Sequence, residues 1–126
     1  MKELMKAYKI LVVDDEKTQL ETVCRGLFLY GFECQGALSV KEALKILAQT
    51  PEHFDLVLTD LTMPERSGLE LIEEIRKRGL RLKIIVITGL AETPELKQVR
   101  KLGIPCLEKP FQPTALVDMI LRALDG

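Results

Sequence analysis

Charged and hydroxyl side chains stand at the ends of four apolar segments of this chain. Asp14 and Asp15 follow the first segment, and Asp60 ends the second. Thr88 follows the third segment, and Lys109 follows the fourth. Apolar runs of this kind are typical of strands buried in a parallel sheet, and ligands of such sheets bind in the crevice beyond the carboxyl ends of the strands. We therefore expect these side chains to share one crevice.

The chemistry of such a cluster follows from its charges. Three carboxylates held close together repel one another, which raises their pKa and costs stability unless a cation lies between them. Mg²⁺ suits carboxylate oxygens and keeps several waters. With the metal bound, one carboxylate can attack a phosphoryl group and form an acyl phosphate. Lys109 would add positive charge and Thr88 a hydroxyl donor for the phosphoryl oxygens.

Each of these residues also has a simpler explanation when taken alone. Asp14 and Asp15 can favour the positive end of a following helix. Asp60 and Thr88 can be turn or cap residues, and Lys109 can be a solvated charge. The combination of an acid pair, a third acid, a hydroxyl and a cation at four strand ends favours a site over four separate accidents.

Alternating strand and helix patterns would position these groups. Apolar residues recur three and four positions apart in five segments, which is typical of helices, and each of these segments follows a short apolar run. Ser39 and Glu42 match a capping box at the start of the second helix. The expected strands are 8–13, 32–37, 54–60, 81–87 and 104–108, and the expected helices are 17–29, 39–50, 69–78, 93–102 and 112–124.

This alternation predicts the α/β class. Five strand–helix units with right-handed connections and helices on both faces give a doubly wound, flavodoxin-like parallel sheet with strand order 2-1-3-4-5. The run 32–37, with its Glu, Gln and Gly residues, is expected at an edge. In this order the ends of the first and third strands are neighbours, which brings Asp14, Asp15 and Asp60 together.

Composition limits the other functions. The 126 residues, 47% hydrophobic, suffice for one domain, and a net charge of -1 with mixed signs disfavours direct nucleic-acid binding. The three cysteines are an odd number without a CxxC pair, which argues against a disulfide framework or a zinc site. The sequence has no apolar stretch approaching the roughly 18 to 20 residues of a membrane span. We therefore expect a cytoplasmic domain without a membrane partner.

The motifs together resemble the receiver domain of two-component response regulators, of the chemotaxis-regulator type. The resemblance covers the chain from about residue 9 to 124, so we expect a receiver domain over residues 8–125 and an N-terminal extension over 1–7. The residues that carry the resemblance are Val12-Val13-Asp14-Asp15-Glu16, Asp60-Leu61-Thr62-Met63-Pro64 with Gly68, Thr88, and Lys109-Pro110-Phe111.

The resemblance implies a phosphorelay function. Asp60 would accept a phosphoryl group from a phosphohistidine on a sensor histidine kinase or a histidine phosphotransfer protein. Asp15 and Asp60 would ligate Mg²⁺ together with the backbone carbonyl of Thr62, while Asp14 would act mostly through a bound water. Lys109 would pair with Asp60 at rest. The domain would catalyse only its own phosphorylation and dephosphorylation, so it is not expected to be an enzyme that turns over a diffusible substrate.

The resemblance also implies a way to transmit the signal. Thr88 and Lys109 would hold the phosphoryl oxygens, drawing the loop after the fourth strand inward and shifting the face formed by the fourth helix, fifth strand and fifth helix. An output domain, a partner or a second copy in a phosphorylation-dependent homodimer would read this face. The Lys109-Pro110 bond is often cis in the family. Cys106 stands where the family commonly has an aromatic switch residue, so output would rely on backbone and helix movement, and Leu90 with Thr62 would flank the hydrolytic water.

Three alternatives are weaker. A degenerate receiver that serves as a phosphorylation-independent binding or dimerisation module would lack Asp15, Asp60 or Lys109, and all three are present. A phosphohydrolase of the haloacid dehalogenase type needs a second acid two residues beyond its nucleophile, where this chain has Thr62, and a cap over the substrate. A flavin-binding protein would need a phosphate-cradling loop rich in Gly, Ser and Thr, which is missing.

Overall fold

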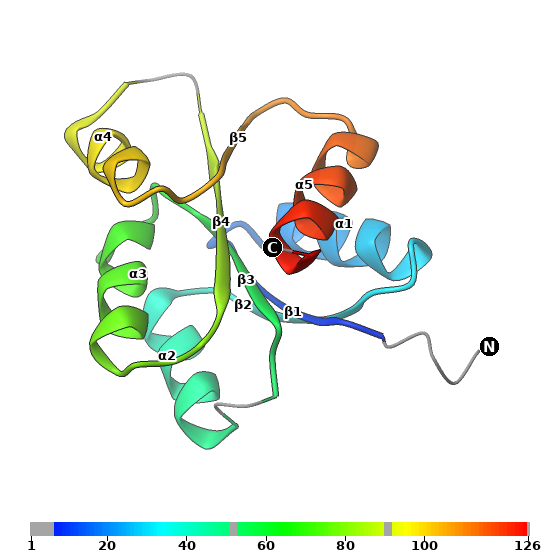
Figure 1. The fold of residues 1–126 in the computed structure, drawn as a ribbon, viewed down its shortest axis with the longest axis horizontal. Helices are drawn as coiled ribbons and strands as arrows, with labels where there is room; N and C mark the ends of the chain where they lie inside the picture. The colour runs from blue at the N-terminus through cyan, green and yellow to red at the C-terminus, as the bar shows by residue number, and fades with distance from the viewer. Residues whose placement is uncertain (1–6, 51–52, 90–91, 126) are drawn as a thin grey trace.

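The computed structural model describes residues 7–50, 53–89 and 92–125. Strands and helices alternate along this part of the chain (Figure 1). The strands are β1 (Lys9–Val13), β2 (Glu33–Ala37), β3 (Leu56–Asp60), β4 (Lys83–Thr88) and β5 (Cys106–Glu108). The helices are α1 (Lys17–Leu29), α2 (Val40–Gln49), α3 (Gly68–Lys77), α4 (Pro94–Lys101) and α5 (Pro113–Asp125). The α/β class predicted from the hydrophobic pattern is confirmed.

The described strands form one parallel sheet in the order β2-β1-β3-β4-β5, as predicted. β2 and β5 are therefore its edges. Val13 pairs with Thr59, so β1 and β3 end at nearly the same height. Asp60 pairs with Ile87 of β4, and Thr88 pairs with Glu108 of β5. This register brings the carboxyl ends of four strands to one edge of the sheet.

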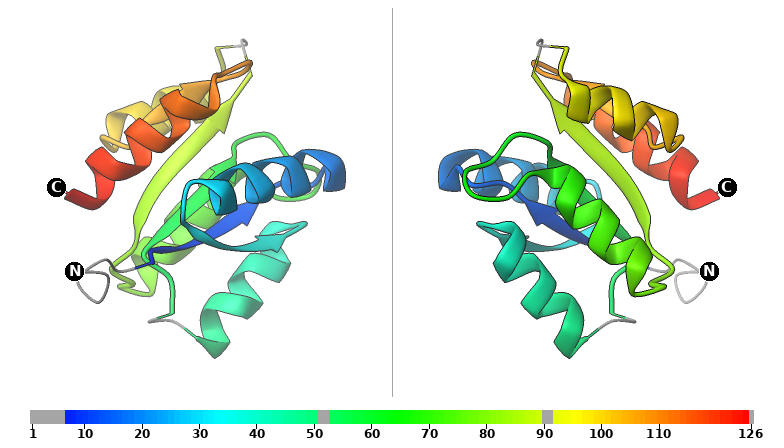
Figure 2. Two further views of the ribbon diagram at one scale, coloured as in Figure 1. Left: turned by 90° about the vertical axis from the view of Figure 1, so that its right-hand side faces the viewer. Right: turned by 90° about the vertical axis from the view of Figure 1, so that its left-hand side faces the viewer.

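Helices cover both faces of the sheet. α1 and α5 lie on one face, and α2, α3 and α4 lie on the other (Figure 2). Successive strand residues supply the two hydrophobic clusters in turn: Ile10 and Val12 pack with α1 and α5, whereas Leu11 and Val13 pack with the other helices. All four are at most 2% exposed, and burying each contributes roughly 1.5–3 kcal/mol. The packed core thus fixes the positions of the strand ends.

Every strand begins one or two residues later than predicted, and β3 and β5 are each two residues shorter than predicted. β3 begins at Leu56, although the apolar pattern starts at Phe54, and β5 begins at Cys106, although the pattern starts at Ile104. Phe54 and Ile104 are nonetheless buried, at 6% and 8% exposure. The sequence pattern reports burial, whereas a strand also needs a neighbour with which its backbone can pair. The predicted strand starts were therefore wrong where a residue is buried before the backbone begins to pair with the next strand.

Helix caps follow the sequence signals. The Ser39 hydroxyl accepts a hydrogen bond from the backbone N–H of Glu42 at 3.0 Å, and the Glu42 carboxylate accepts one from the N–H of Leu38 at 2.9 Å. Thr93 caps α4 by accepting from the N–H of Leu96 at 3.1 Å. These contacts fix where the helices begin, and so how far each loop extends over the carboxyl edge of the sheet.

The single histidine and the three cysteines are not part of the group of strand-end residues. His53 is exposed beside Phe54, with the ring centroids 5.1 Å apart. The cysteines are free, and Cys106 is half-buried against the hydrophobic cluster beneath α2, α3 and α4. None of the helices in the described ranges is long and apolar enough to span a bilayer.

Candidate functional site

The carboxylates of Asp14, Asp15 and Asp60 lie together at the carboxyl edge of the sheet. One oxygen from each of the three lies within 4.8 Å of the others. Asp14 is buried, Asp15 is exposed and Asp60 is intermediate. The adjacency of β1 and β3 brings them together, as the strand order predicted. Their proximity is confirmed, while their roles as ligands stay a prediction.

Asp14 is held by the backbone of the turn into α1. Its Oδ1 accepts a hydrogen bond from the N–H of Glu16 at 2.9 Å, and its own N–H donates to the carbonyl of Ala37 at 3.1 Å. The N-cap residue of α1 is Glu16, whose side chain makes no capping bond. The simpler explanation, capping of the helix by these acids, therefore accounts for one oxygen of Asp14. It does not account for Asp15, whose carboxylate has no hydrogen bond or ion pair with the described residues.

Lys109 supplies positive charge opposite the acids. Its Nζ donates to Oδ2 of Asp60 at 3.2 Å, in an ion pair whose side chains are 30% and 13% exposed. The same nitrogen donates to Oε1 of Gln19 at 3.2 Å. The backbone N–H of Lys109 bonds to the carbonyl of Thr88 at 2.8 Å, and the Lys109-Pro110 bond is cis. The expected resting pair between Lys109 and Asp60 is present.

The balance of burial and charge raises the pKa of the Asp60 carboxyl. Burial raises the pKa of Asp60, the Lys109 ammonium lowers it, and the neighbouring Asp14 raises it again, for a net rise above the usual value. The Lys109 ammonium thus does not fully offset the burial of Asp60 and its closeness to Asp14. Three hard oxygen donors with surplus negative charge fit a divalent cation such as Mg²⁺, which binds a few carboxylates and keeps waters.

The remaining predicted residues lie around this cluster. Thr88 is 6% exposed at the end of β4, and its hydroxyl donates to the carbonyl of Gly89 at 3.3 Å rather than to Asp60. Thr62 is exposed on the loop directly after Asp60. Leu90 lies outside the described residues. Thr88 is therefore close in the sheet register but is not yet engaged with the acids.

Gly68 packs closely against the backbone of Asp60. It begins α3 and donates its N–H to the carbonyl of Leu61 at 2.8 Å. A Cβ at this position would lie 2.4 Å from the backbone oxygen of Asp60, which is closer than any side chain tolerates. Helix α3 can approach β3 this closely because residue 68 is glycine.

Sequence reasoning missed Gln19 as a contact of the site. It lies two residues into α1, whose apolar stripe alone marked the helix. A polar residue on the first turn of a helix carries no signal of its own, because most such residues face solvent. The contact follows from how α1 packs over β1 and β2, which periodicity does not specify.

Comparison with known proteins identifies the class that this fold and site define. Residues 10–121 match the family model described as the response regulator receiver domain. The match spans most of the chain, so the chain belongs to that family and is a receiver domain of a two-component response regulator. The resemblance read from the sequence motifs is confirmed.

Relatives in sequence include regulators and one kinase. The chain is 34% identical over 121 residues to the response regulator protein PilR of Pseudomonas aeruginosa, covering 95% of this chain and 27% of PilR. It is 33% identical over 121 residues to the transcriptional regulatory protein FixJ of Rhizobium meliloti, covering 94% and 58%. It is 35% identical over 102 residues to the sensor histidine kinase RcsC of Escherichia coli, covering 80% and 10%. The chain thus spans between a tenth and three-fifths of these proteins.

Solved receiver domains share the fold over nearly the whole chain. A receiver domain from Clostridium thermocellum superimposes with a TM-score of 0.87 at 33% identity, covering 94% of each chain. The chemotaxis protein CheY4 of Vibrio cholerae gives a TM-score of 0.82 at 28% identity, covering 94% of this chain and 99% of the other. These likenesses confirm the flavodoxin-like fold and give no support to a haloacid dehalogenase.

Proposed function

We propose that this receiver domain is a phosphoacceptor whose Asp60 takes a phosphoryl group from a phosphohistidine on a sensor histidine kinase or a histidine phosphotransfer protein. The observation that carries the proposal is the 3.2 Å ion pair between Asp60 and Lys109, next to Asp14 and Asp15. A sensor histidine kinase among the relatives fits a phosphohistidine donor.

The transfer forms one bond and breaks another. An oxygen of the Asp60 carboxylate attacks phosphorus, and the bond between phosphorus and the donor imidazole breaks with its electron pair left on nitrogen. During transfer, negative charge is spread over the phosphoryl oxygens. The Lys109 ammonium, already bonded to Asp60, lies close enough to stabilise that charge. The Thr88 hydroxyl, now bonded to a neighbouring carbonyl, rotates to donate to one of these oxygens.

The same acids provide the metal site of the proposal. Asp15, Asp60 and the backbone carbonyl of Thr62 would hold Mg²⁺, with Asp14 acting mostly through a water, and the ion would neutralise charge on the transferring oxygens. Asp14 is held in place by the N–H of Glu16 and keeps its second oxygen for this purpose. Because Asp15 is exposed, the ion can enter and leave from solvent.

The signal passes to the surface formed by α4, β5 and α5. Thr88 ends β4, and its carbonyl accepts a hydrogen bond from the N–H of Lys109 just after β5. A movement of Thr88 therefore displaces both the loop after β4 and the loop after β5. Cys106 on β5 is packed against the core and stands where the family commonly has an aromatic switch residue. The α4–β5–α5 face therefore changes through movements of its backbone and helices. An output domain, a protein partner or a second copy forming a phosphorylation-dependent homodimer reads this face; nucleic acid does not bind the domain directly.

The scope of the activity follows from the mechanism. The domain, residues 8–125 with an extension over 1–7, is modified and then loses the phosphoryl group to water, so it catalyses only its own phosphorylation and dephosphorylation. It acts in the cytoplasm. A degenerate, phosphorylation-independent module gains no support from the site, since Asp15, Asp60 and Lys109 are all present and adjacent.

The test is the intact mass of the purified domain after incubation with acetyl phosphate, with and without Mg²⁺. The wild type is expected to gain one phosphoryl group only with Mg²⁺, the adduct is expected to be labile to hydroxylamine, and Asp60→Asn is expected to gain none. Full uptake by Asp60→Asn would show that another residue is the acceptor. Failure of the wild type with acetyl phosphate and also with phosphohistidine donors would favour the degenerate module.

A further inference from the structure

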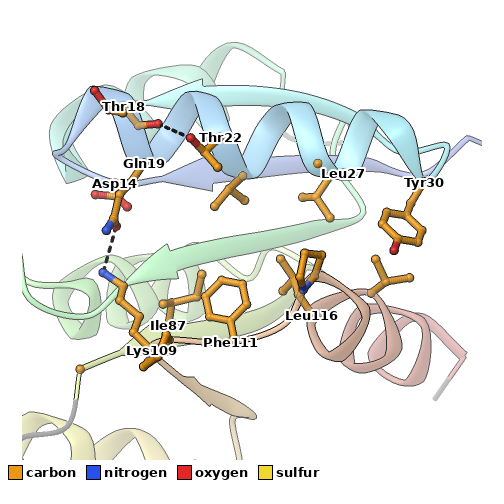
Figure 3. A pocket seen from close by; sticks show the side chains of 16 residues that line it. Asp14, Thr18, Gln19, Thr22, Leu27, Tyr30, Ile87, Lys109, Phe111 and Leu116 are labelled. Carbon is orange, nitrogen blue, oxygen red and sulfur yellow. Dashed lines mark hydrogen bonds between the residues drawn. The ribbon is translucent and has the colours of Figure 1, made fainter.

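Lys109 is held by two acceptors that come from different parts of the fold. One is the carboxylate of Asp60 at the end of β3, and the other is the side-chain amide oxygen of Gln19 on α1. Both lie 3.2 Å from Nζ. Figure 3 shows Gln19 and Lys109 extending toward each other across the space between α1 and the loop before α5.

Gln19 can serve as a fixed point because its helix is anchored. The next residue, Leu20, is 7% exposed and belongs to the hydrophobic cluster beneath α1 and α5. Lysine, in contrast, carries its charge on a flexible four-carbon stem. A second acceptor on a rigid helix therefore restricts where the ammonium can lie, at a cost in side-chain entropy that is met before the reaction begins.

The chemistry of the second acceptor is also suited to the site. An amide oxygen accepts a hydrogen bond from an ammonium without adding negative charge. A carboxylate at position 19 would be a fourth acid beside Asp14, Asp15 and Asp60 and would compete with the incoming phosphoryl group for Lys109. Gln19 orients the cation and leaves its charge available.

The surroundings offer Lys109 few other partners. Gln19 and Lys109 lie at one end of an open groove of about 610 Å³ between α1 and α5. Thr22, a polar residue of the same groove, already donates its hydroxyl to the carbonyl of Thr18 at 2.9 Å. Of the side chains in the described ranges, Gln19 and Asp60 are those bonded to Lys109. The walls of the groove are largely apolar and include Val23, Leu27, Tyr30, Phe111, Leu116 and Val117.

We propose that Gln19 is a positioning residue for phosphoryl transfer: it holds the Lys109 ammonium where it meets the oxygens of the phosphoryl group arriving at Asp60. The inference rests on the proposed function, because it concerns the rate of that reaction. Gln19 acts through Lys109 and does not itself touch the reacting atoms.

The first test measures the position of Lys109 directly, in metal-free protein. The rate at which an amine-acylating reagent modifies Lys109 is followed by peptide mass spectrometry in wild type, Gln19→Met, Gln19→Glu and Thr22→Val. Methionine keeps the length of glutamine without the acceptor, so we expect Lys109 to react about fivefold faster, the factor that corresponds to one hydrogen bond of about 1 kcal/mol. Gln19→Glu keeps an acceptor and adds a negative charge, so its Lys109 should react no faster than in the wild type. Thr22→Val, in the same groove, should match the wild type.

The second test measures the reaction. With phosphoramidate as donor, Gln19→Met should lower the phosphorylation rate about fivefold while the Mg²⁺ concentration for half-maximal rate stays unchanged, because no proposed metal ligand is altered. Thr22→Val should leave both quantities unchanged. Thermal unfolding of each variant establishes that it is folded. A shift in Mg²⁺ dependence, or an equal loss in Thr22→Val, would overturn a positioning role.

The two proposals fail in different ways. If the wild type takes up no phosphoryl group from any donor, the proposed function is wrong. If Lys109 is equally reactive in wild type and Gln19→Met, the role of Gln19 is wrong, whatever the wild type does with phosphoryl donors.

Discussion

Both ends of the sheet carry charged side chains, but in the described part of the chain three carboxylates crowd together only at the carboxyl end. At the amino end, the backbone N–H of Lys9 donates to Asp55 at 2.9 Å, and the Lys9 ammonium lies 3.6 Å from Glu33. The same ammonium lies 2.5 Å from Nε2 of His53. At the carboxyl end, Asp14, Asp15 and Asp60 face one ammonium within the described residues, that of Lys109.

The difference separates exposed ion pairs of the surface from a group of crowded acids that indicates a ligand site. Exposed ion pairs such as Lys9–Glu33 contribute about 0–1 kcal/mol and tolerate substitution. A surplus of buried or crowded acids destabilises the folded state, and such arrangements cluster at functional sites. The uncompensated end of the sheet is therefore the end where a ligand is expected.

The largest effect is expected from an acid at the uncompensated end. Asp15→Asn should lower magnesium-dependent phosphorylation about 100-fold, the upper range of what loss of a supporting group costs a metal site. Intact mass after timed incubation with acetyl phosphate measures it. Glu33→Gln neutralises an acid at the amino end and is the matched control. Equal losses in both variants would mean that the two ends do not differ in function.

Magnesium should stabilise the wild type because the ion relieves the surplus charge. At ten times its dissociation constant, a ligand that binds only the folded state adds about 1.4 kcal/mol, which raises the melting temperature by about 5 °C in a domain of this size. Asp14→Asn and Asp60→Asn should show less than half of this rise. The control is the same ionic strength of potassium chloride, and a similar rise with potassium would refute a specific site.

Without metal, Asp60→Asn should be more stable to unfolding than the wild type at pH 7. The gain should be smaller than the stabilisation of about 1.4 kcal/mol expected from Mg²⁺. Because the pKa of Asp60 is raised in the folded state, its ionised form destabilises the fold above that pKa. Below the ordinary carboxyl pKa the group is protonated in both states, so the difference should disappear. Urea unfolding of both proteins at pH 3 and pH 7 measures it. A variant that is less stable at pH 7 would mean that the pair with Lys109 outweighs burial and repulsion.

The smallest effect belongs to the balanced end. Glu33→Gln removes a pair of 3.6 Å in which the glutamate side chain is 54% exposed, so the free energy of unfolding should change by less than about 0.5 kcal/mol. Urea unfolding with and without added salt measures it. A loss above about 1 kcal/mol would show that the amino end also depends on its charges.

The fold and most of the site could be predicted because both depend on local patterns. Alternating apolar runs and helical stripes gave the strand order, and polar residues at the strand ends indicated Asp14, Asp15, Asp60, Thr88 and Lys109. The contact between Gln19 and Lys109 joins residues 90 positions apart and depends on the rotation of α1 about its axis. The hydroxyl direction of Thr88 depends on its immediate backbone. Neither is encoded in periodicity.

Gly68 gives the site a vulnerability that no inventory of charged residues reveals. Since any side chain at this position would collide with the backbone of Asp60, even Gly68→Ala would push β3 and helix α3 apart. Such a protein would retain every acid, the threonine and the lysine, yet present the Asp60 carboxylate in a displaced position. A genomic survey that scores receivers by their charged residues alone would count it as functional; a reliable survey must also read the glycine eight positions beyond the aspartate.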